Sequence, residues 1–293
     1  MIAFNLIAPI ELSRAGARAR GFSLVEMALV LLIVGLLAAV FLPATNTLLD
    51  NNRRKETRAK LEALEQAMVR FVMANRRLPC PADGDLPPGN ANQGLELAAG
   101  GACTALALTN GVVPWRNLGL SQADATDAWG TIVSYRVWGG AAVGPTTLTG
   151  NTGPGTGMDM TGLDPTNAGA VNSWLSTRGF RACNAAACAV GSAAELTSKV
   201  NGNGVAYFLI SHGPNRFGGF SADGNYLGTS VGAPPGPLEN INRSTVPLRS
   251  ASPNDFYVDA DFAENPAAYY DDLVLRPTIL SVAMAAGLGP RRP

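Results

Sequence analysis

Arg20-Gly21-Phe22-Ser23-Leu24-Val25-Glu26 opens the stretch that decides the fold, and an apolar run continues from it to Leu42-Pro43. Glu26 is the only formally charged residue between Phe22 and Leu42. As a helix that rises about 1.5 Å per residue, this run would measure roughly 31 Å, enough to cross the hydrocarbon core of a bilayer. A carboxylate near the middle of such a helix costs on the order of 2.5–3.5 kcal/mol. The sequence therefore predicts a membrane-spanning helix over 22–42 in which Glu26 has a function.

Two ordinary kinds of N-terminal segment compete with a specialised one. A secretory signal peptide has a shorter apolar region, and its small-residue cleavage site follows that region, whereas Gly21 precedes the run here. A plain signal anchor, with Glu26 reaching the lipid head groups, accounts for the run but gives the Gly21-Phe22 pair no role.

The same residues resemble the class III signal of type IV pilins and type II secretion pseudopilins. In that family a basic leader ends in glycine, phenylalanine follows, and a glutamate lies inside the apolar helix, as Gly21, Phe22 and Glu26 do here. The resemblance implies cleavage by prepilin peptidase between Gly21 and Phe22 and methylation of the new Phe22 amine. It also implies that Glu26 pairs with the Phe22 ammonium of a neighbouring subunit and that Pro43 is the helix-bending proline used in assembly. Flanking charges do not decide the orientation, so the cleavage motif alone places the leader in the cytoplasm.

The resemblance implies an α+β, pilin-like fold, in which a long N-terminal hydrophobic helix packs on an antiparallel sheet with long loop insertions. The expected order is a leader over 1–21, a transmembrane helix over 22–42, the soluble half of the helix over 43–75, and a periplasmic globular head over 76–293. The expected location is the inner membrane, crossed once, with later incorporation into a pilus or pseudopilus. The expected partners are prepilin peptidase, other pilin or pseudopilin subunits, the inner-membrane assembly platform and membrane lipid.

The soluble half of the helix is predicted over about 48–74. In the head, the segment 131–138 alternates as a strand does, and 204–210 is the clearest strand of the chain. The predicted helix carries one apolar stripe, which comprises Leu61, Leu64, Met68, Phe71 and Val72. Asp127-Ala128-Trp129-Gly130 resembles the Asp-Pro-Trp-Gly stretch of the major pseudopilins, with alanine in place of proline. We expect the helical stripe to pack against the sheet.

Four cysteines in a chain with an export signal suggest up to two disulfides. The sequence leaves three pairings open. We favour Cys80–Cys103 and Cys183–Cys188 because each pair closes a local loop.

A calcium site is possible near the second strand. The segment 211–219, followed later by Asp271 and Asp272, resembles the loop that holds a structural calcium ion in major pseudopilins. Two aspartates offer the hard oxygen ligands that calcium prefers. Asn215 stands where aspartate is common, and about fifty residues separate Gly219 from Asp271. The alternative is that Asp271 and Asp272 cap the chain or face solvent and bind no metal, and that the insertion presents a variable surface to a partner.

Several classes of function find no support in the sequence. Formal net charge is zero, so no electrostatic footprint for nucleic acid is predicted. His212 is the only histidine, and its neighbour Ser211 would point to the opposite face of a strand, a poor geometry for a nucleophile and its base. A phosphate-binding loop and a nucleophile elbow are both absent from the sequence. We therefore predict a chain that is not an enzyme, and a turn position for His212.

The predicted function is that of a structural subunit, a minor pilin or pseudopilin, of a type IV pilus or a type II secretion pseudopilus. The alternative is a filament-tip binding module or adhesin that contacts a ligand or secretion substrate through its insertions at 139–170 and 220–268. The sequence does not separate a secretion pseudopilus from a pilus, or a tip position from a shaft position.

Overall fold

The computed structural model describes residues 23–99, 102–103, 111–137, 160, 179–197, 204–228, 235–244, 256–265 and 267–288. Within these ranges the side chains of residues 40–47, 98, 99 and 102 are not described. The chain divides into two compact units, Met1–Asp50 and Asn51–Pro293. The proposed cleavage residues Gly21 and Phe22, the leader and most of the insertion at 139–170 lie outside the described residues.

Helix α1 (Leu24–Asn75) is the first described element, and its backbone continues through Pro43, where the sequence suggested a kink or an interruption. It begins with a capping box, in which the Ser23 amide donates to Glu26 Oε2 at 2.8 Å and the Glu26 amide donates to Ser23 Oγ at 3.2 Å. The reciprocal bonds satisfy two amide groups that the first turn of a helix leaves unpaired.

The expected fold class is wrong in its membrane part. Among the residues that the structure describes, no helix has a run that is long and apolar enough to cross a membrane. The long hydrophobic N-terminal helix, the transmembrane segment over 22–42 and the single-pass location in the inner membrane are corrected accordingly.

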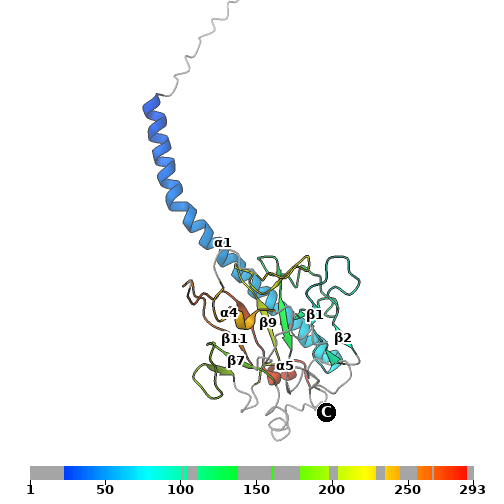
Figure 1. Cartoon of the computed structure of the whole chain (residues 1–293). Coiled ribbons are helices and arrows are strands. Elements are labelled where there is room, and N and C mark those ends of the chain that lie inside the picture. Colours follow the sequence, from blue (N-terminus) through cyan, green and yellow to red (C-terminus); the bar gives the residue numbers. More distant parts are fainter. Residues whose placement is uncertain are drawn as a thin grey trace, which may run out of the picture. The chain divides into compact units, whose positions relative to one another are not determined.

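The Asn51–Pro293 unit is built mainly from short strands around one antiparallel sheet (Figure 1), whose strand order is β1-β4-β6-β9-β12. The strands of this sheet are β1 (Ala82–Asp83), β4 (Gly111–Val112), β6 (Ser134–Val137), β9 (Tyr207–Ser211) and β12 (Leu273–Leu275). Smaller sheets are formed by β2 (Ala98–Ala99) with β3 (Ala102–Cys103), by β5 (Thr131–Ile132) with β10 (Phe220–Ser221), and by β11 (Phe256–Val258), β7 (Arg181–Cys183) and β8 (Glu195–Thr197). Two short helices, α4 (Glu239–Asn242) and α5 (Ile279–Ala285), complete the described elements.

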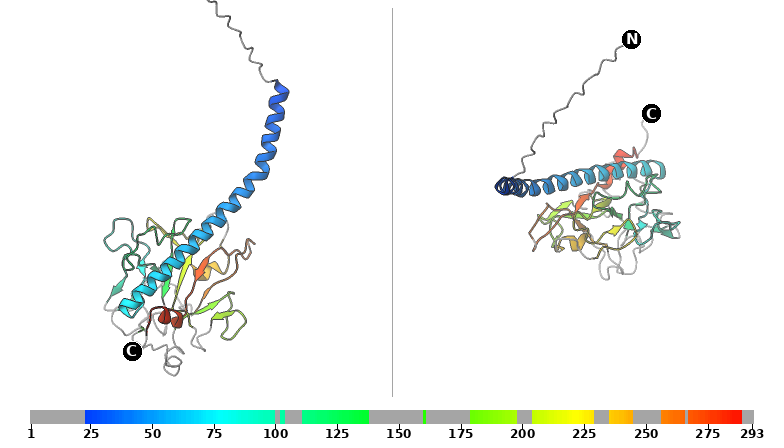
Figure 2. Two further views of the ribbon diagram at one scale, coloured as in Figure 1. Left: turned by 180° about the vertical axis from the view of Figure 1, so that it is seen from behind. Right: turned by 90° about the horizontal axis from the view of Figure 1, so that it is seen from above.

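The central strand β9 divides the core because successive side chains of a strand point to opposite faces. Tyr207 and Leu209 belong to the larger core cluster, which also contains the α1 residues Leu61, Leu64, Met68 and Val72. Phe208 and Ile210 belong to a second cluster on the other face, with Ala182 of β7 and Val205. The part of α1 after Asp50 thus covers one face of the sheet (Figure 2), and β7 lies on the other.

The Asp127-Trp129 turn is held by one buried carboxylate. Asp127 Oδ1 accepts from the amides of Trp129 and Thr131, both at 2.9 Å, and Oδ2 accepts from the Ser211 hydroxyl at 2.6 Å. The turn leads into β5 and β6, where the sequence predicted one strand, and Trp138 lies outside the described residues. The bond to Ser211 ties this turn to the end of β9.

Two disulfides link Cys80 to Cys103 and Cys183 to Cys188. These are the two local pairings that the sequence analysis favoured. The second lies in the small sheet, since Cys183 ends β7.

Candidate functional site

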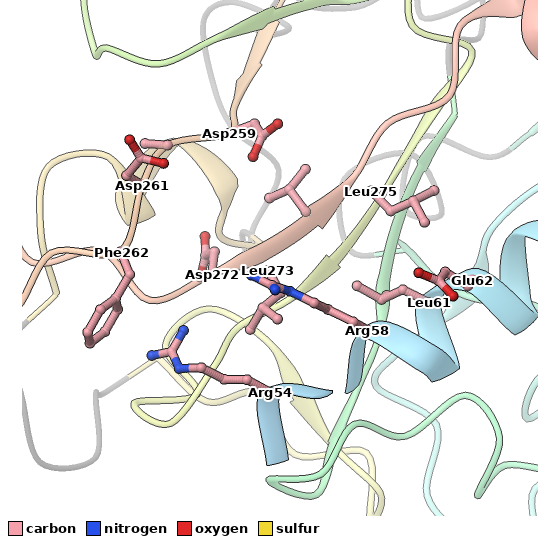
Figure 3. A pocket seen from close by; sticks show the side chains of 12 residues that line it. Arg54, Arg58, Leu61, Glu62, Asp259, Asp261, Phe262, Asp272, Leu273 and Leu275 are labelled. Carbon is pink, nitrogen blue, oxygen red and sulfur yellow. The ribbon is translucent and has the colours of Figure 1, made fainter. Parts of the chain in front are cut away.

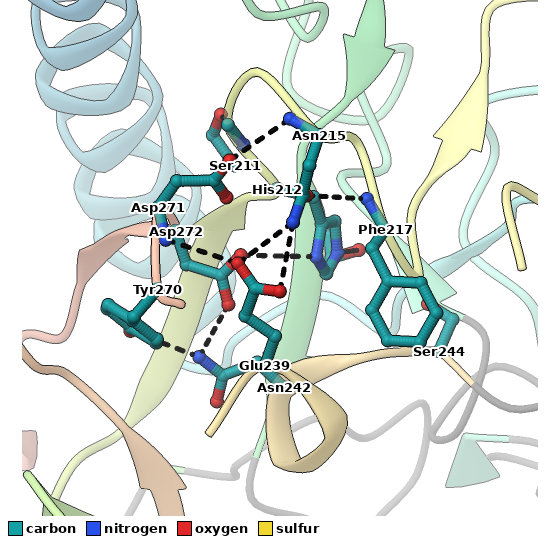
Figure 4. Close-up of polar contacts among 12 residues, drawn as sticks. Ser211, His212, Asn215, Phe217, Glu239, Asn242, Ser244, Tyr270, Asp271 and Asp272 are labelled. Carbon is teal, nitrogen blue, oxygen red and sulfur yellow. Dashed lines mark hydrogen bonds and ion pairs between the residues drawn. The ribbon is translucent and has the colours of Figure 1, made fainter. Parts of the chain in front are cut away.

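The strongest polar cluster in the described part of the chain lies where β9 ends and β12 begins. These strands are antiparallel neighbours, with Ser211 opposite Leu273, so the residues just after β9 meet those just before β12. Asp271 and Asp272 come from this end of β12, and Glu239 is the first residue of α4 (Figure 4). All three carboxylates are buried, and one ligand oxygen from each lies within 4.8 Å of the other two.

The Glu239 carboxylate accepts hydrogen bonds on both of its oxygens. The Asn215 side-chain amide donates to Oε1 at 3.0 Å and to Oε2 at 2.9 Å. Backbone amides of Asp271 and Gly236 donate to Oε1 and Oε2 at 3.2 and 3.1 Å. Asn215 therefore acts through its side-chain N–H groups as a donor to Glu239.

In each aspartate of the cluster, one carboxylate oxygen accepts hydrogen bonds and the other accepts none from the described residues, although Asp272 Oδ1 lies 3.7 Å from His212 Nδ1. Asp271 Oδ2 accepts from the Asn215 amide at 3.0 Å and from the Tyr269 hydroxyl at 2.9 Å, and Asp272 Oδ2 accepts from the Asn242 side chain at 2.8 Å. The Oδ1 atoms of Asp271 and Asp272 are buried and have no hydrogen-bond partner. Buried polar atoms without a partner are costly, so these two oxygens fit the ligand set of a hard divalent cation.

The pKa values of the carboxyl groups in the cluster also fit a site that binds a cation. Burial, followed by the negative charges of Asp272 and Asp271, raises the pKa of Glu239 to about 8. Burial and the charge of Asp272 likewise raise the pKa of Asp271 to about 6. Three carboxylates in one buried site repel one another, and either protons or a bound cation would relieve this repulsion.

In metal-free buffer we expect the free energy of unfolding to fall as the pH rises from about 4.5 to about 8. The folded state holds the Glu239 proton above the ordinary pKa of 4.5, so between these values the folded chain binds more protons than the unfolded chain. The fall should not exceed about 1.4 kcal/mol per pH unit for one proton and should level off above pH 8. Urea unfolding at several pH values measures it. Glu239→Gln should flatten this slope, and an unchanged slope in that variant would contradict the assignment.

His212 directly follows β9, immediately before the turn over 213–218, and its side chain is completely buried. Its Nε2 is 2.9 Å from Ser134 Oγ, and its Nδ1 is 3.7 Å from Asp272 Oδ1. The residues resemble a Ser-His-Asp arrangement, but Ser134 and His212 are completely buried, so no substrate reaches the hydroxyl. We assign these contacts a structural role beside the carboxylates.

The structure brings Asp271 and Asp272 together with Asn215, and it adds Glu239 and Asn242 from the 220–268 insertion. No pattern in the sequence points to these two residues, since α4 has only four residues and no periodic pattern. Asn242 also exchanges hydrogen bonds of 2.9 Å with Val258 of β11 through both side-chain atoms. Part of the insertion is therefore core and not a surface decoration, and its deletion would remove buried polar partners.

The remaining predicted site residues lie elsewhere. Glu26 lies in the capping box of α1, Pro43 lies within the helical backbone, and Gly21 and Phe22 fall outside the description.

Comparison of the chain with protein-family models, curated proteins and solved structures finds no match.

Proposed function

We propose that this chain is a structural subunit of a filament of the type IV pilus or type II secretion pseudopilus class, processed by prepilin peptidase. The observation that carries the proposal is the sequence Gly21-Phe22-Ser23-Leu24-Val25-Glu26, in which a glutamate follows the cleavage motif at a fixed spacing. The chain would act as substrate of the peptidase and as building block, with the assembly platform and other subunits as its partners.

The start of α1 supports the role of Glu26. Its carboxylate is exposed and bonds to the amide of Ser23, one residue from the amine that cleavage before Phe22 would create. The Glu26 side chain is long enough to reach the Ser23 amide of its own chain. We therefore expect it to be long enough to reach the Phe22 ammonium of an adjacent subunit. Two opposite charges buried together between subunits offset part of their desolvation, whereas a single buried charge does not. The pair would therefore fix the axial register of neighbouring subunits.

The test is to tag the chain in cells, shear and purify the filaments, and ask whether the processed chain copurifies with the major subunit. We expect copurification that disappears when the assembly ATPase is deleted. A processed chain that stays out of filaments in both strains would contradict the structural role and would favour a separate binding function.

We propose in addition that the cluster of Glu239, Asp271 and Asp272 holds a structural calcium ion. Two observations support this site. The Oδ1 atoms of Asp271 and Asp272 are buried without a hydrogen bond from the described residues. One oxygen from each of the three carboxylates lies within 4.8 Å of the other two. A bound Ca²⁺ would supply charge neutralisation and would tie α4 to the start of β12. The residues that would hold it are these three carboxylates.

Calcium should raise the melting temperature of the chain by about 5–10 °C at roughly one hundred times its dissociation constant, and a chelator should reverse the rise. Differential scanning calorimetry measures both. Asp271→Asn should lose this response, whereas Asp223→Asn, at an exposed turn, should keep it. If calcium does not change the melting temperature of the native chain, the proposed calcium site is wrong.

A further inference from the structure

Asn242, the last residue of α4, binds β11 in the way that a neighbouring strand would. Its side-chain Nδ2 donates to the Val258 carbonyl and its Oδ1 accepts from the Val258 amide, both at 2.9 Å. Among the described strands, β11 pairs with β7 and with no other. The outer edge of β11 is therefore held at Val258 by a carboxamide, which has the same donor and acceptor groups as the backbone of an adjacent strand.

The same carboxamide contacts the carboxylate cluster (Figure 4), since Asn242 Nδ2 also donates to Asp272 Oδ2 at 2.8 Å. The other oxygen of this carboxylate, Oδ1, is buried without a hydrogen bond from the described residues. Because a carboxylate is planar and rigid, a cation held by Oδ1 would also fix the position of Oδ2. Asp272 thus joins the proposed cation site to the residue that holds β11.

The other edge of β11 is bonded to β7 at the same point. Val258 lies opposite Cys183 in the parallel register, and the Asp259 amide donates to the Cys183 carbonyl at 2.8 Å. Cys183 is linked in turn to Cys188. The end of β11 therefore lies between Asn242 on one side and a loop closed by a disulfide on the other.

The preceding part of β11 is held by contacts that do not involve the carboxylates. The Tyr257 ring packs on the rings of Phe180 and Phe208, with centroid distances of 5.4 and 5.1 Å. An effect of the cation on β11 should therefore be concentrated at Val258 and Asp259.

A cavity of about 350 Å³ beside β12 reaches the cluster, because Asp272 is part of its lining (Figure 3). Asp259 and Asp261 also line it, together with Arg54 and Arg58 of α1. A buried metal site requires a path by which the ion enters. This cavity provides such a path to Asp272.

We propose that calcium bound by Glu239, Asp271 and Asp272 controls how firmly β11 is held at Val258, with Asn242 as the positioning residue between the two. The inference rests on the calcium site proposed above. Coupling between two sites is reciprocal, so the factor by which calcium strengthens the hold on Val258 is also the factor by which loss of that hold weakens calcium binding. Such factors typically lie between about 5 and about 150.

The first test compares amide hydrogen exchange of the full chain in saturating calcium and in a chelator. We expect calcium to slow exchange of the Val258 and Asp259 amides by at least about fivefold more than that of the Glu96 amide. Glu96 is a matched reference, because its amide likewise donates to an asparagine side chain, Asn117 Oδ1, at 2.8 Å. If calcium raises the melting temperature but slows all three amides equally, the calcium site stands and the inference is overturned. If calcium changes neither quantity, the calcium site is wrong and the inference falls with it.

The second test measures calcium affinity by titration calorimetry. Asn242→Ala should weaken calcium binding by at least about fivefold, whereas Asn117→Ala should leave the affinity unchanged. Each substitution removes a carboxamide that accepts from a backbone amide, so a general loss of stability would affect both variants. Equal affinity of the native chain and Asn242→Ala would overturn the inference. The exchange experiment uses the native chain, so it decides the question even if Asn242→Ala does not fold.

Discussion

Replacing Leu64 with alanine should lower the free energy of unfolding of the chain by about 2–5 kcal/mol. Leu64 is only 1% exposed and lies in the core cluster that joins α1 to the sheet. The substitution removes apolar area from the core and leaves a cavity that the surrounding side chains fill incompletely, and both effects destabilise the folded state. Urea unfolding followed by circular dichroism measures the change.

The matched control for Leu64 is Gln66→Ala, on an exposed position of the same helix. Its effect should stay within about 0.5 kcal/mol, because no buried contact is lost and both residues favour helix. If the two variants unfold alike, the apolar stripe of α1 does not anchor the helix to the sheet, and the description of the core would have to be revised.

Replacing Glu26 with alanine should leave cleavage intact and reduce the amount of chain in sheared filaments by about 10–100-fold. The expected loss corresponds to one charge-assisted hydrogen bond between subunits, about 1.5–3 kcal/mol. Quantitative immunoblotting of the filament fraction against the total processed chain measures it.

Ser23→Ala separates the two roles that Glu26 can have. Ser23 and Glu26 cap α1 reciprocally, so either substitution weakens the helix start. Only Glu26→Ala removes the charge that is proposed to meet the neighbouring Phe22 amine. If Ser23→Ala depletes the filament fraction as strongly as Glu26→Ala does, the effect is local capping and the register role of Glu26 is wrong.

The features predicted best from the sequence are local ones, because they depend on residues that are close together along the chain. The stripe of Leu61, Leu64, Met68 and Val72 follows the helical period and is buried, although Phe71 is only half-buried. The strand predicted over 204–210 corresponds to β9, which the structure places at Tyr207–Ser211. The main error was the membrane-spanning helix predicted over 22–42 from a count of consecutive apolar residues. Among the described residues, no helix is long and apolar enough to cross a membrane.

Long-range pairing could not be predicted. β11 runs parallel to β7, about seventy-five residues earlier in the chain, and no local pattern sets that register. Glu239 enters the carboxylate cluster because α4 places it opposite Asn215 and Asp271, and only the folded chain brings these residues together.

The intact mass of the protein, isolated from cells with and without prepilin peptidase, shows whether that peptidase processes this chain. We expect a chain that begins at Phe22, with or without one added methyl group, when the peptidase is present, and a chain that retains residues 1–21 when it is absent. A chain that begins at Met1 in both kinds of cell would mean that the peptidase does not process it and that the proposed function is wrong.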